Sequence, residues 1–424
     1  VITDIVQFFI AMFGSIALAI IALNHVGGMD TLLQKLSSLL GTDIIHENTL
    51  KFIPPIPDNS IGSLSFWESP FSKFLIFITV MWWSHHGTDG GGYIIQRMSS
   101  AKNEKHALLA TLWFNLAHYA VRVWPWIIVG VVSIVMFPVI PDSYSELGTK
   151  AGYPLVMNML LGPGMKGILI VSFLAAFMST IDTHLNWGAS YIINDIYKRF
   201  FKPNESEKHY VIVSKVITVI LMILAAFTAL KMQSISKAWA FIFSMGAGIG
   251  LVLILRWFWW RINAWSEITA LSTSIVITIL LETLAWWQVS AKEGVYSLFG
   301  TEPVLFGIQI QVHHKLIIIV PIAILSWLIA TFITKPEPTE HLRKFYEKVQ
   351  PGGWWGPITT NFKHTLQPVS EGILVQWIAG VMMIYGFTFG IGNLIFMQYG
   401  NSILLLGCAF IGSYIIWNRS ISKL

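Results

Sequence analysis

The sequence predicts an all-α fold, a polytopic helical membrane protein with about ten transmembrane helices. Of its 424 residues, 54% are hydrophobic and only 12% are charged. Soluble domains carry roughly 25% charged residues, so this chain has too few charges to cover a soluble surface of its size. Its net charge of +5 is therefore interpreted by position along the chain and not as a nucleic-acid-binding surface.

Ten apolar stretches account for the predicted helices. A hydrocarbon core needs about 20 apolar residues per helix. The stretches of this length are 4–24, 72–95, 108–137, 163–196, 210–230, 238–258, 264–288, 315–334, 372–396 and 401–418. Two contain glycine-rich breaks, "HHGTDGGGY" in the second and "SMGAGIG" in the sixth. The first has no basic segment before it and no cleavage site after it, so it is interpreted as a span and not a signal peptide. Since it starts directly at Val1, further sequence is expected upstream.

The basic residues predict the orientation in the membrane. Cytoplasmic loops carry an excess of Lys and Arg. If residue 1 is placed in the cytoplasm and the spans alternate, the larger share of the 27 Lys and Arg residues falls on the cytoplasmic side. We therefore expect a multi-pass protein of the cell membrane with residue 1 and the C-terminus both cytoplasmic. The segment "TEHLRKFYEKVQ" at 339–350 is expected to form a short helix at that surface.

The fourth stretch has one polar face. On a helical wheel, half of the circumference between 172 and 194 holds the polar side chains Ser172, Ser179, Asp182, Thr183, Asn186, Ser190 and Asn194. An Asp at a helix centre costs about 2.5–3.5 kcal/mol on insertion scales. Asp182 therefore needs a partner, a watery cavity or a cation.

Sodium is one explanation for this face. It is a small hard cation, and such ions favour oxygen ligands. The hydroxyls of Ser179, Thr180 and Thr183 and the carboxylate of Asp182 offer oxygens within about one turn. The alternative is a polar contact between helices. Asp4 poses the same question near the start of the first stretch, and its alternative is a role at a helix N-terminus.

The break in the second stretch is a candidate solute site. Non-helical backbone at membrane depth is tolerated only inside protein or beside a watery cavity, and transporters place substrate sites at discontinuous helices. The candidate residues are Trp83, His85, His86 and Asp89. Trp83 has a packing role as its alternative. His85, His86 and Asp89 have metal binding as theirs, which the divergent directions of adjacent helical histidines disfavour.

A single arginine lies inside the third stretch. Arg122 is expected to neutralise a buried carboxylate such as Asp182 or Asp89. Binding of an anionic solute group and snorkelling toward the interface are the alternatives. The one cysteine, Cys408, excludes an intrachain disulfide and any metal or redox motif built from several cysteines.

Four segments resemble the sodium:solute symporter family, the relatives of the sodium/glucose cotransporters. "TDIVQFF" resembles the start of the family's fifth core helix, and "YIIQRMSSAKNEKHALLATLWF" resembles the segment after the sixth. "FLAAFMSTIDTHLNWGASYIINDIYKRF" resembles the eighth core helix, and "LRWFWWRINAWSEI" the cytoplasmic end of the tenth. The resemblance spans nearly the whole chain.

The resemblance implies a fold similar to the leucine-transporter architecture, with two inverted five-helix repeats and added peripheral helices. Residues 1–260 would then hold core helices five to ten, an incomplete core. Residues 261–424 would hold peripheral transmembrane helices and a cytoplasmic loop at 335–371. Core helices one to four would be absent from this chain.

The resemblance also implies sodium ligands. The matching positions are Ala176, Ser179, Thr180, Asp4, Asp182 and Thr183. Ala176, Ser179 and Thr180 match the common sodium site, Ala176 through its backbone carbonyl. Asp4 matches a helix-five Asp that binds a second sodium in some members. A carboxylate at 182 departs from the usual Ser or Thr, so sodium and a proton both remain open there.

The resulting hypothesis is a sodium-coupled symporter that imports a small organic solute by alternating access, and not an enzyme. Sodium would be the coupling ion and no other cofactor is expected. A sugar is the first candidate solute, although "HHGTDGGG" differs from the corresponding segment of sugar-transporting relatives. The alternatives are a sodium-responsive sensor with the same fold and a membrane metalloenzyme. The oligomeric state is left open.

Overall fold

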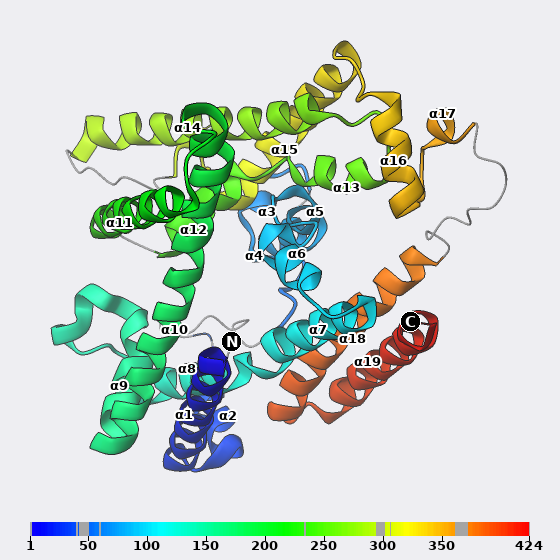
Figure 1. Ribbon diagram of the computed structural model, residues 1–424. Helices are drawn as coiled ribbons and strands as arrows, with labels where there is room; N and C mark the ends of the chain where they lie inside the picture. Colours follow the sequence, from blue (N-terminus) through cyan, green and yellow to red (C-terminus); the bar gives the residue numbers. More distant parts are fainter. Residues whose placement is uncertain are drawn as a thin grey trace. The chain divides into compact units, whose positions relative to one another are not determined.

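The computed structural model describes residues 2–39, 41, 51–58, 61–232, 235–293, 302–305, 307–360 and 372–423. Nearly all regular structure within these ranges is helical (Figure 1). One short antiparallel pair is formed by β1 (Val304–Leu305) and β2 (Ile308–Gln309). The predicted all-α fold class is confirmed.

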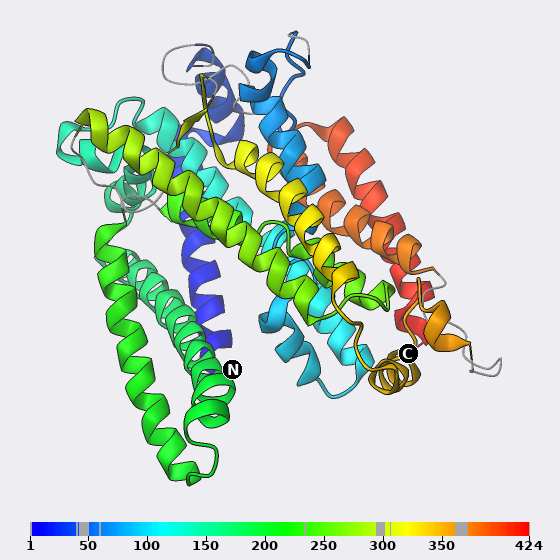
Figure 2. The same cartoon turned by 90° about the horizontal axis from the view of Figure 1, so that it is seen from above.

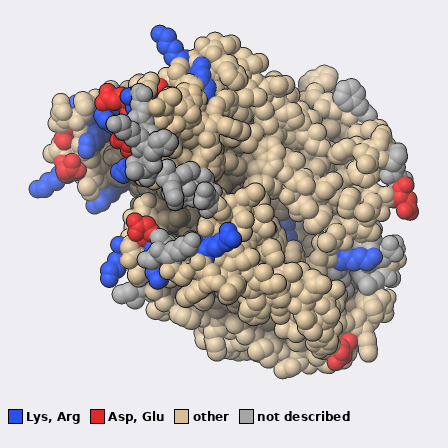
Figure 3. Space-filling view, turned by 90° about the vertical axis from the view of Figure 1, so that its right-hand side faces the viewer, with Lys and Arg blue, Asp and Glu red and all other residues tan. Residues whose placement is uncertain are grey.

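Eight helices within the described ranges are long and apolar enough to cross a membrane, and a ninth span is possible if one bent pair counts as a single span. The bent pair is α12 (Ile235–Met245) and α13 (Gly250–Phe258), with 42° between its two halves. On the face shown in Figure 3 most of the surface carries no charged side chain. The chain is a multi-pass helical membrane protein, as its composition predicts.

The predicted span at 72–95 differs from the other nine. A helix runs through α4 (Pro70–Ile76), the π-helical η1 (Phe77–Met81) and α5 (Trp82–Ser84), and it then stops. After a break the chain resumes as α6 (Gly91–Ser99). Neither piece alone is long enough to count as a span, so this stretch is a discontinuous helix.

The chain divides into two compact units that are interleaved along the sequence. Unit 1 comprises Val1–Leu50, Leu109–Leu230 and Ile378–Lys423, and unit 2 comprises Lys51–Leu108 and Lys231–Trp377. Each unit therefore joins segments that are distant in sequence. The predicted division at residue 260 into core and peripheral helices is a different one and stays a prediction.

The core of unit 1 is built around α1 (Ile2–Val26), which packs against α8 (Val123–Met136) and α10 (Pro163–Tyr191). The fully buried side chains of this core include Leu18, Ala22, Val129, Val132, Val156 and Leu169. α1 and α10 run in opposite directions (Figures 1 and 2). They approach closely at Gly14, where a Cβ would lie 2.9 Å from Leu169 Cδ1.

The longest helix of unit 1 is α10 together with its π-helical continuation η4 (Ile192–Phe201). It has 39 residues from Pro163 to Phe201. At 1.5 Å per residue its length is about 58 Å, nearly twice the thickness of a hydrocarbon core. α11 (Glu207–Lys231) folds back beside it as a hairpin (Figure 2).

Small residues bring α18 (Ile373–Ile395) and α19 (Tyr399–Arg419) together. A Cβ on Gly386 would lie 2.7 Å from Leu405 O, and one on Gly412 would lie 2.5 Å from Ala379 O. Such close backbone approach through small residues is the usual basis of helix pairing in membranes.

Unit 2 contains an antiparallel pair, α14 (Ala264–Glu293) and α15 (Val312–Ile333) (Figure 2). At one end Ser266 Oγ lies 2.7 Å from Thr331 Oγ1. At the other end buried Lys315 pairs with Glu282. The predicted short helix at 339–350 is present as α16 (Thr339–Val349), and its apolar residues pack on Trp355.

The remaining helical segments complete the described part of the chain, and two of them continue into α8 to form the apolar span Glu104–Met136. The remaining segments are α2 (Gly28–Leu39), α3 (Leu64–Glu68), α7 (Glu104–Asn115), η2 (Leu116–Val121), η3 (Asp142–Ala151), α9 (Gly152–Leu160), α17 (Gly356–Thr359) and η5 (Ile421–Lys423).

Candidate functional site

The polar face predicted from the fourth stretch lies on α10. Asp182 is the middle residue of the 39-residue helix Pro163–Phe201. Its carboxylate is exposed, and Asn186 Nδ2 donates a hydrogen bond of 2.9 Å to Asp182 Oδ1. The hydrogen-bond partner of the Asp182 carboxylate is thus a side chain one turn further along the same helix.

The hydroxyls of this face donate their hydrogens to the helix backbone. Thr180 Oγ1 donates to Ala176 O at 2.9 Å, and Thr183 Oγ1 donates to Ser179 O at 2.9 Å. A hydroxyl that donates to a carbonyl still has lone pairs that can accept a hydrogen bond or bind a cation. Ser179 and Thr183 are half-buried, whereas Ala176 and Thr180 are exposed. The five predicted oxygen donors of α10 therefore lie within about two turns of one helix.

The sixth predicted sodium ligand, Asp4, lies in α1, the helix that packs against α10. Its side chain is outside the described part of the chain. The structure therefore brings the predicted helices together and leaves the position of this carboxylate as a prediction.

The solute candidates on the second stretch surround the break in the discontinuous helix. The predicted break is confirmed, and it covers His85–Gly90 between α5 and α6. It starts at His85, as the segment "HHGTDGGGY" predicts, but it ends earlier than predicted, because Gly91 and Gly92 already belong to α6. Gly90 has φ +92° and Gly91 has φ +62°, conformations that glycine adopts without strain.

Three polar side chains of the break have partners within it or in the adjoining helix ends. Thr88 Oγ1 donates to Trp82 O at 2.8 Å, and Gly87 N donates to His85 Nδ1 at 2.8 Å. Gly91 N donates to Asp89 Oδ1 at 2.9 Å. Because unpaired backbone groups are costly at membrane depth, these bonds make the break stable there.

The second predicted break, between α12 and α13, packs directly on the first. Gly248 N donates to Ser84 O at 2.8 Å, which satisfies a carbonyl at the end of α5. A Cβ on Gly250 would overlap the carbonyl oxygens of Trp83 and His85. A Cβ on Gly246 would likewise overlap the ring of His86. The sequence predicts both breaks but not their contact.

Asp89 is part of an ion network. Its Oδ2 lies 2.8 Å from Arg256 Nη2, and Arg256 Nη1 lies 3.0 Å from Glu267 Oε1. The Asp89 side chain is only 9% exposed, whereas those of Arg256 and Glu267 are 36% and 35% exposed. Sequence reasoning missed Arg256 and Glu267. The available signal was an arginine shortly after one glycine-rich break and a carboxylate inside the other.

Arg122 does not show the expected carboxylate partner within the described residues. Its guanidinium Cζ lies 5.2 Å from the ring centroid of Trp126, a cation–π contact. Its Nε has no hydrogen-bond partner within the described residues. Asp89 pairs with Arg256 instead, and Asp182 accepts from Asn186. The aromatic ring stabilises the guanidinium where the sequence suggested a carboxylate.

Two further observations concern the alternative roles of the residues at the first break, which are packing for Trp83 and metal binding for the histidines. Trp83 Nε1 donates to Thr79 O at 2.7 Å, so its indole N–H is already used. Among the residues that the structure describes, no three His, Cys, Asp or Glu side chains lie close enough together to hold a metal ion. His85 and His86 therefore gain no support as metal ligands.

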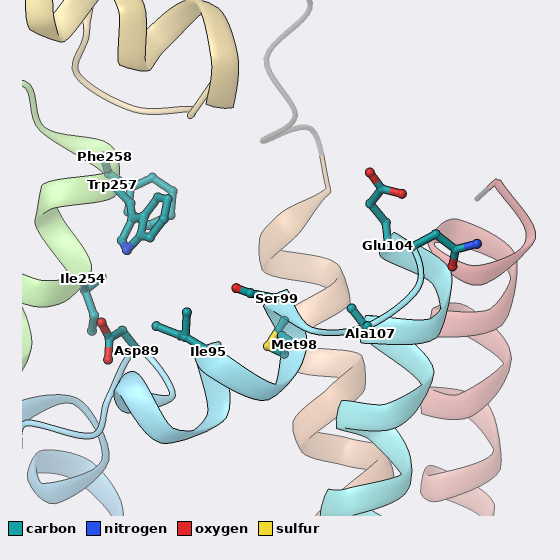
Figure 4. Close-up of a pocket in the computed structure, with 11 residues that line it drawn as sticks. Asp89, Ile95, Met98, Ser99, Glu104, Ala107, Ile254, Trp257 and Phe258 are labelled. Carbon is teal, nitrogen blue, oxygen red and sulfur yellow. The ribbon is translucent and has the colours of Figure 1, made fainter. Parts of the chain in front are cut away.

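A cavity of about 680 Å³ opens beside Asp89 (Figure 4). Its walls come from α6, the start of α7 and α13. The apolar wall includes Ile95, Met98 and Trp257, and the polar lining is Asp89, Ser99, Asn103 and Glu104. The volume lies within the range of small-molecule pockets.

Comparison with known proteins shows which family this chain resembles. A sequence model of the sodium:solute symporter family matches residues 1–293. The sodium/glucose cotransporter 4 of Danio rerio is 24% identical over 379 residues, 83% of this chain and 54% of that protein. The sodium/glucose cotransporter 1 of Oryctolagus cuniculus is 24% identical over 367 residues, 80% of this chain and 54% of that protein.

Similarity also extends to bacterial proline transporters. The high-affinity proline transporter PutP of Bacillus subtilis is 30% identical over 146 residues, 33% of this chain and 29% of that protein. The chain spans about half the length of the two cotransporters that it matches.

Proposed function

This chain belongs to the sodium:solute symporter family, and from that premise we propose that its protein is a sodium-coupled symporter that imports a small organic solute by alternating access. Sodium is the coupling ion, and the solute is the cargo. The observation that carries the proposal is the oxygen-rich face at the middle of α10, on a helix that packs against α1.

The position of this face suits a cation site. In transporters, ion and substrate sites lie near the bilayer midplane. Asp182 is the middle residue of the long helix, with Ser179 and Thr183 within one turn of it. An ionised side chain at such depth marks an ion or substrate pathway by default. The hydroxyl lone pairs, the Ala176 carbonyl and the Asp182 carboxylate are all oxygen donors.

The antiparallel packing of α1 supports Asp4 as part of the same site. Gly14 of α1 meets Leu169 of α10. Ten residues before Gly14 lies Asp4, and ten residues after Leu169 lies Ser179. Each interval corresponds to about 15 Å of helix, and the two helices run in opposite directions. Asp4 and Ser179 are thus at the same level of the helix pair.

Ligands on two helices provide a route to coupling. Sodium can favour one conformation only if it binds that conformation more tightly than the other. A site shared between α1 and α10 meets this condition, because relative movement of the helices changes the distances between the ligands. Each sodium that enters a cell at −100 mV gains about 2.3 kcal/mol from the membrane potential, which is available to drive solute uptake.

The solute remains a proposal at the level of its class. The relatives are named for glucose, mannose and proline. All three are small polar organic molecules, so we propose a solute of this class, of which a sugar is one example. Trp83, His85, His86, Asp89 and Arg122 stay predicted solute contacts. Of these, Asp89 is held by Arg256 in this structure.

Uptake by the full-length protein in vesicles tests the proposal. A sodium gradient should stimulate solute uptake, whereas a sensor that does not complete transport would show sodium binding without uptake. Ser179→Ala should raise the sodium concentration for half-maximal uptake by about tenfold, because loss of one ligand worth about 1.4 kcal/mol has that effect.

Ser190→Ala is the matched control for this substitution. Ser190 lies on the same helix, is exposed, and stands about 16 Å further along α10. Its replacement should leave the sodium dependence unchanged. An unchanged dependence in Ser179→Ala, with normal expression and uptake, would remove Ser179 from the site.

A further inference from the structure

The two glycine-rich breaks of unit 2 are joined at both ends of their contact. At one end Gly248 N donates to Ser84 O, and Gly250 leaves room for the carbonyls of Trp83 and His85. At the other end Arg256 of α13 pairs with Asp89 of the first break. α6 therefore has a fixed start relative to α13.

Arg256 also extends this connection to a third helix. Its Nη1 pairs with Glu267 of α14 while its Nη2 pairs with Asp89. The planar guanidinium can hold two carboxylates at once, which the single ammonium of a lysine does less well. Asp89 in turn caps α6, since its second carboxylate oxygen accepts from Gly91 N.

The network stands between two cavities. Asp89 lines the cavity of about 680 Å³, and Arg256 lines a second cavity of about 300 Å³. Trp257, the residue after Arg256, belongs to the walls of both. In Figure 4 Asp89 lies at the edge of the larger cavity, near Ile254 of α13. Movement of α6 away from α13 would therefore change the shape of the larger cavity.

We propose that Arg256 is a positioning residue, which holds the two discontinuous helices together as one body and keeps the larger cavity narrow. In this proposal Asp89 is the anchor for Arg256, a role that replaces the solute contact predicted for it from the sequence. When the pair separates, α6 moves away from α13 and the cavity widens. If the larger cavity is part of the solute's route, that part of the inference rests on the proposed symporter function. The role of Arg256 in holding α6 and α13 together does not depend on it.

Burial explains why the pair controls this position. Asp89 is 9% exposed, and removal of a partner leaves a buried charge uncompensated. The carboxylate would then favour a conformation in which water reaches it. The guanidinium of Arg256 contacts this carboxylate directly, and the same guanidinium pairs with Glu267.

Accessibility of a reporter cysteine tests the proposal. Ser99 lines the larger cavity at the end of α6. In the full-length protein, Cys408→Ser removes the only native cysteine in this chain and Ser99→Cys supplies the reporter. The rate of reaction with a bulky maleimide is measured in detergent, so that the result does not depend on membrane orientation.

The expected result is faster labelling when the pair is broken. Arg256→Gln and Asp89→Asn should each raise the rate by about fivefold or more, the usual size of a conformational coupling. Asp89→Asn keeps an oxygen for Gly91 N, so it removes the charge but not the cap. The double variant should label no faster than either single variant, because each substitution alone already removes the same ion pair. Glu267→Gln should have a smaller effect.

Two controls separate this effect from general loosening. A reporter at Ser206, in the exposed turn before α11, should label at an unchanged rate in the same variants. If Arg256→Gln does not fold, Arg256→Lys replaces it. Lysine keeps the positive charge but lacks the planar guanidinium that holds two carboxylates, so this variant should label at an intermediate rate.

An unchanged rate at position 99 in folded variants, additive effects in the double variant, or an equal rise at position 206 would overturn the proposal. Sodium-driven uptake is measured separately. Absent uptake with the labelling pattern intact would refute the symporter function and leave the role of Arg256 in place.

Discussion

Asp182 poses the clearest question at the scale of single residues. Its neighbour Asn186 donates to Asp182 Oδ1, and an asparagine at 182 would still offer an oxygen to that bond. Asp182→Asn therefore removes the charge without removing the hydrogen bond. We expect normal expression and a thermal midpoint close to that of the parent, together with altered sodium coupling or altered pH dependence of uptake.

The measurement for Asp182→Asn is solute uptake against sodium concentration at several pH values, beside a thermal unfolding curve. A changed pH profile at unchanged sodium dependence would indicate a proton at this position, and the converse would indicate sodium. Loss of folding with no selective change in coupling would make Asp182 a structural residue.

Residues on one helix were predictable, whereas partners across the chain were not. The periodicity of an α-helix is enough to place Ser179, Asp182 and Thr183 together, and α10 is helical throughout. The partner of Asp89 is Arg256, 167 positions away. Local pattern carries no information about such a pair. The same limit explains why a carboxylate was expected for Arg122 where the structure has the ring of Trp126.

At the scale of elements, glycine content predicted where helices stop but not the residue at which they resume. The break ends at Gly90, and Gly91 begins α6 despite its positive φ. The N–H groups in the first turn of a helix have no acceptor inside the helix, so α6 can begin only where an outside group accepts from them. Asp89 supplies one of them to Gly91. A capping carboxylate thus sets the boundary, and glycine counting alone does not include it.

The contact between the two breaks predicts the effect of filling one glycine. Gly250→Ala would place a methyl group on the carbonyl oxygens of Trp83 and His85, which are backbone atoms and cannot rotate away. Overpacking typically costs about 1–3 kcal/mol. We expect a loss of stability of roughly that size, measured as a lower thermal midpoint of the purified full-length protein.

Gly356→Ala is the control for this substitution. Gly356 is also in unit 2, at the start of α17, and a Cβ there would meet no atom within 4 Å. Its replacement should leave the midpoint nearly unchanged. Equal midpoints for both variants would show that the breaks do not pack as closely as described.

At the scale of the whole molecule, composition was enough for the fold class because a shortage of charge excludes a soluble surface. The division into units could not be predicted in this way. Residues 109–230 and 378–423 share unit 1, while the residues between them form most of unit 2. Hydropathy identifies spans one at a time and does not say which spans pack together.

Orientation in the membrane is the property of the whole chain that the sequence predicts and that labelling can decide. α9 and the start of α11 stand at opposite ends of the long helix Pro163–Phe201, because one precedes it and the other follows it. Exposed Ser143, before α9, is predicted outside, and exposed Ser206, before α11, is predicted in the cytoplasm.

In the Cys408→Ser background, a membrane-impermeant thiol reagent added to intact cells should label Ser143→Cys and not Ser206→Cys. After the cells are opened, both should react. Labelling of Ser206→Cys alone in intact cells would reverse the predicted topology, and with it the predicted cytoplasmic location of residue 1 and of the C-terminus, since a fixed alternation of spans links all of these positions.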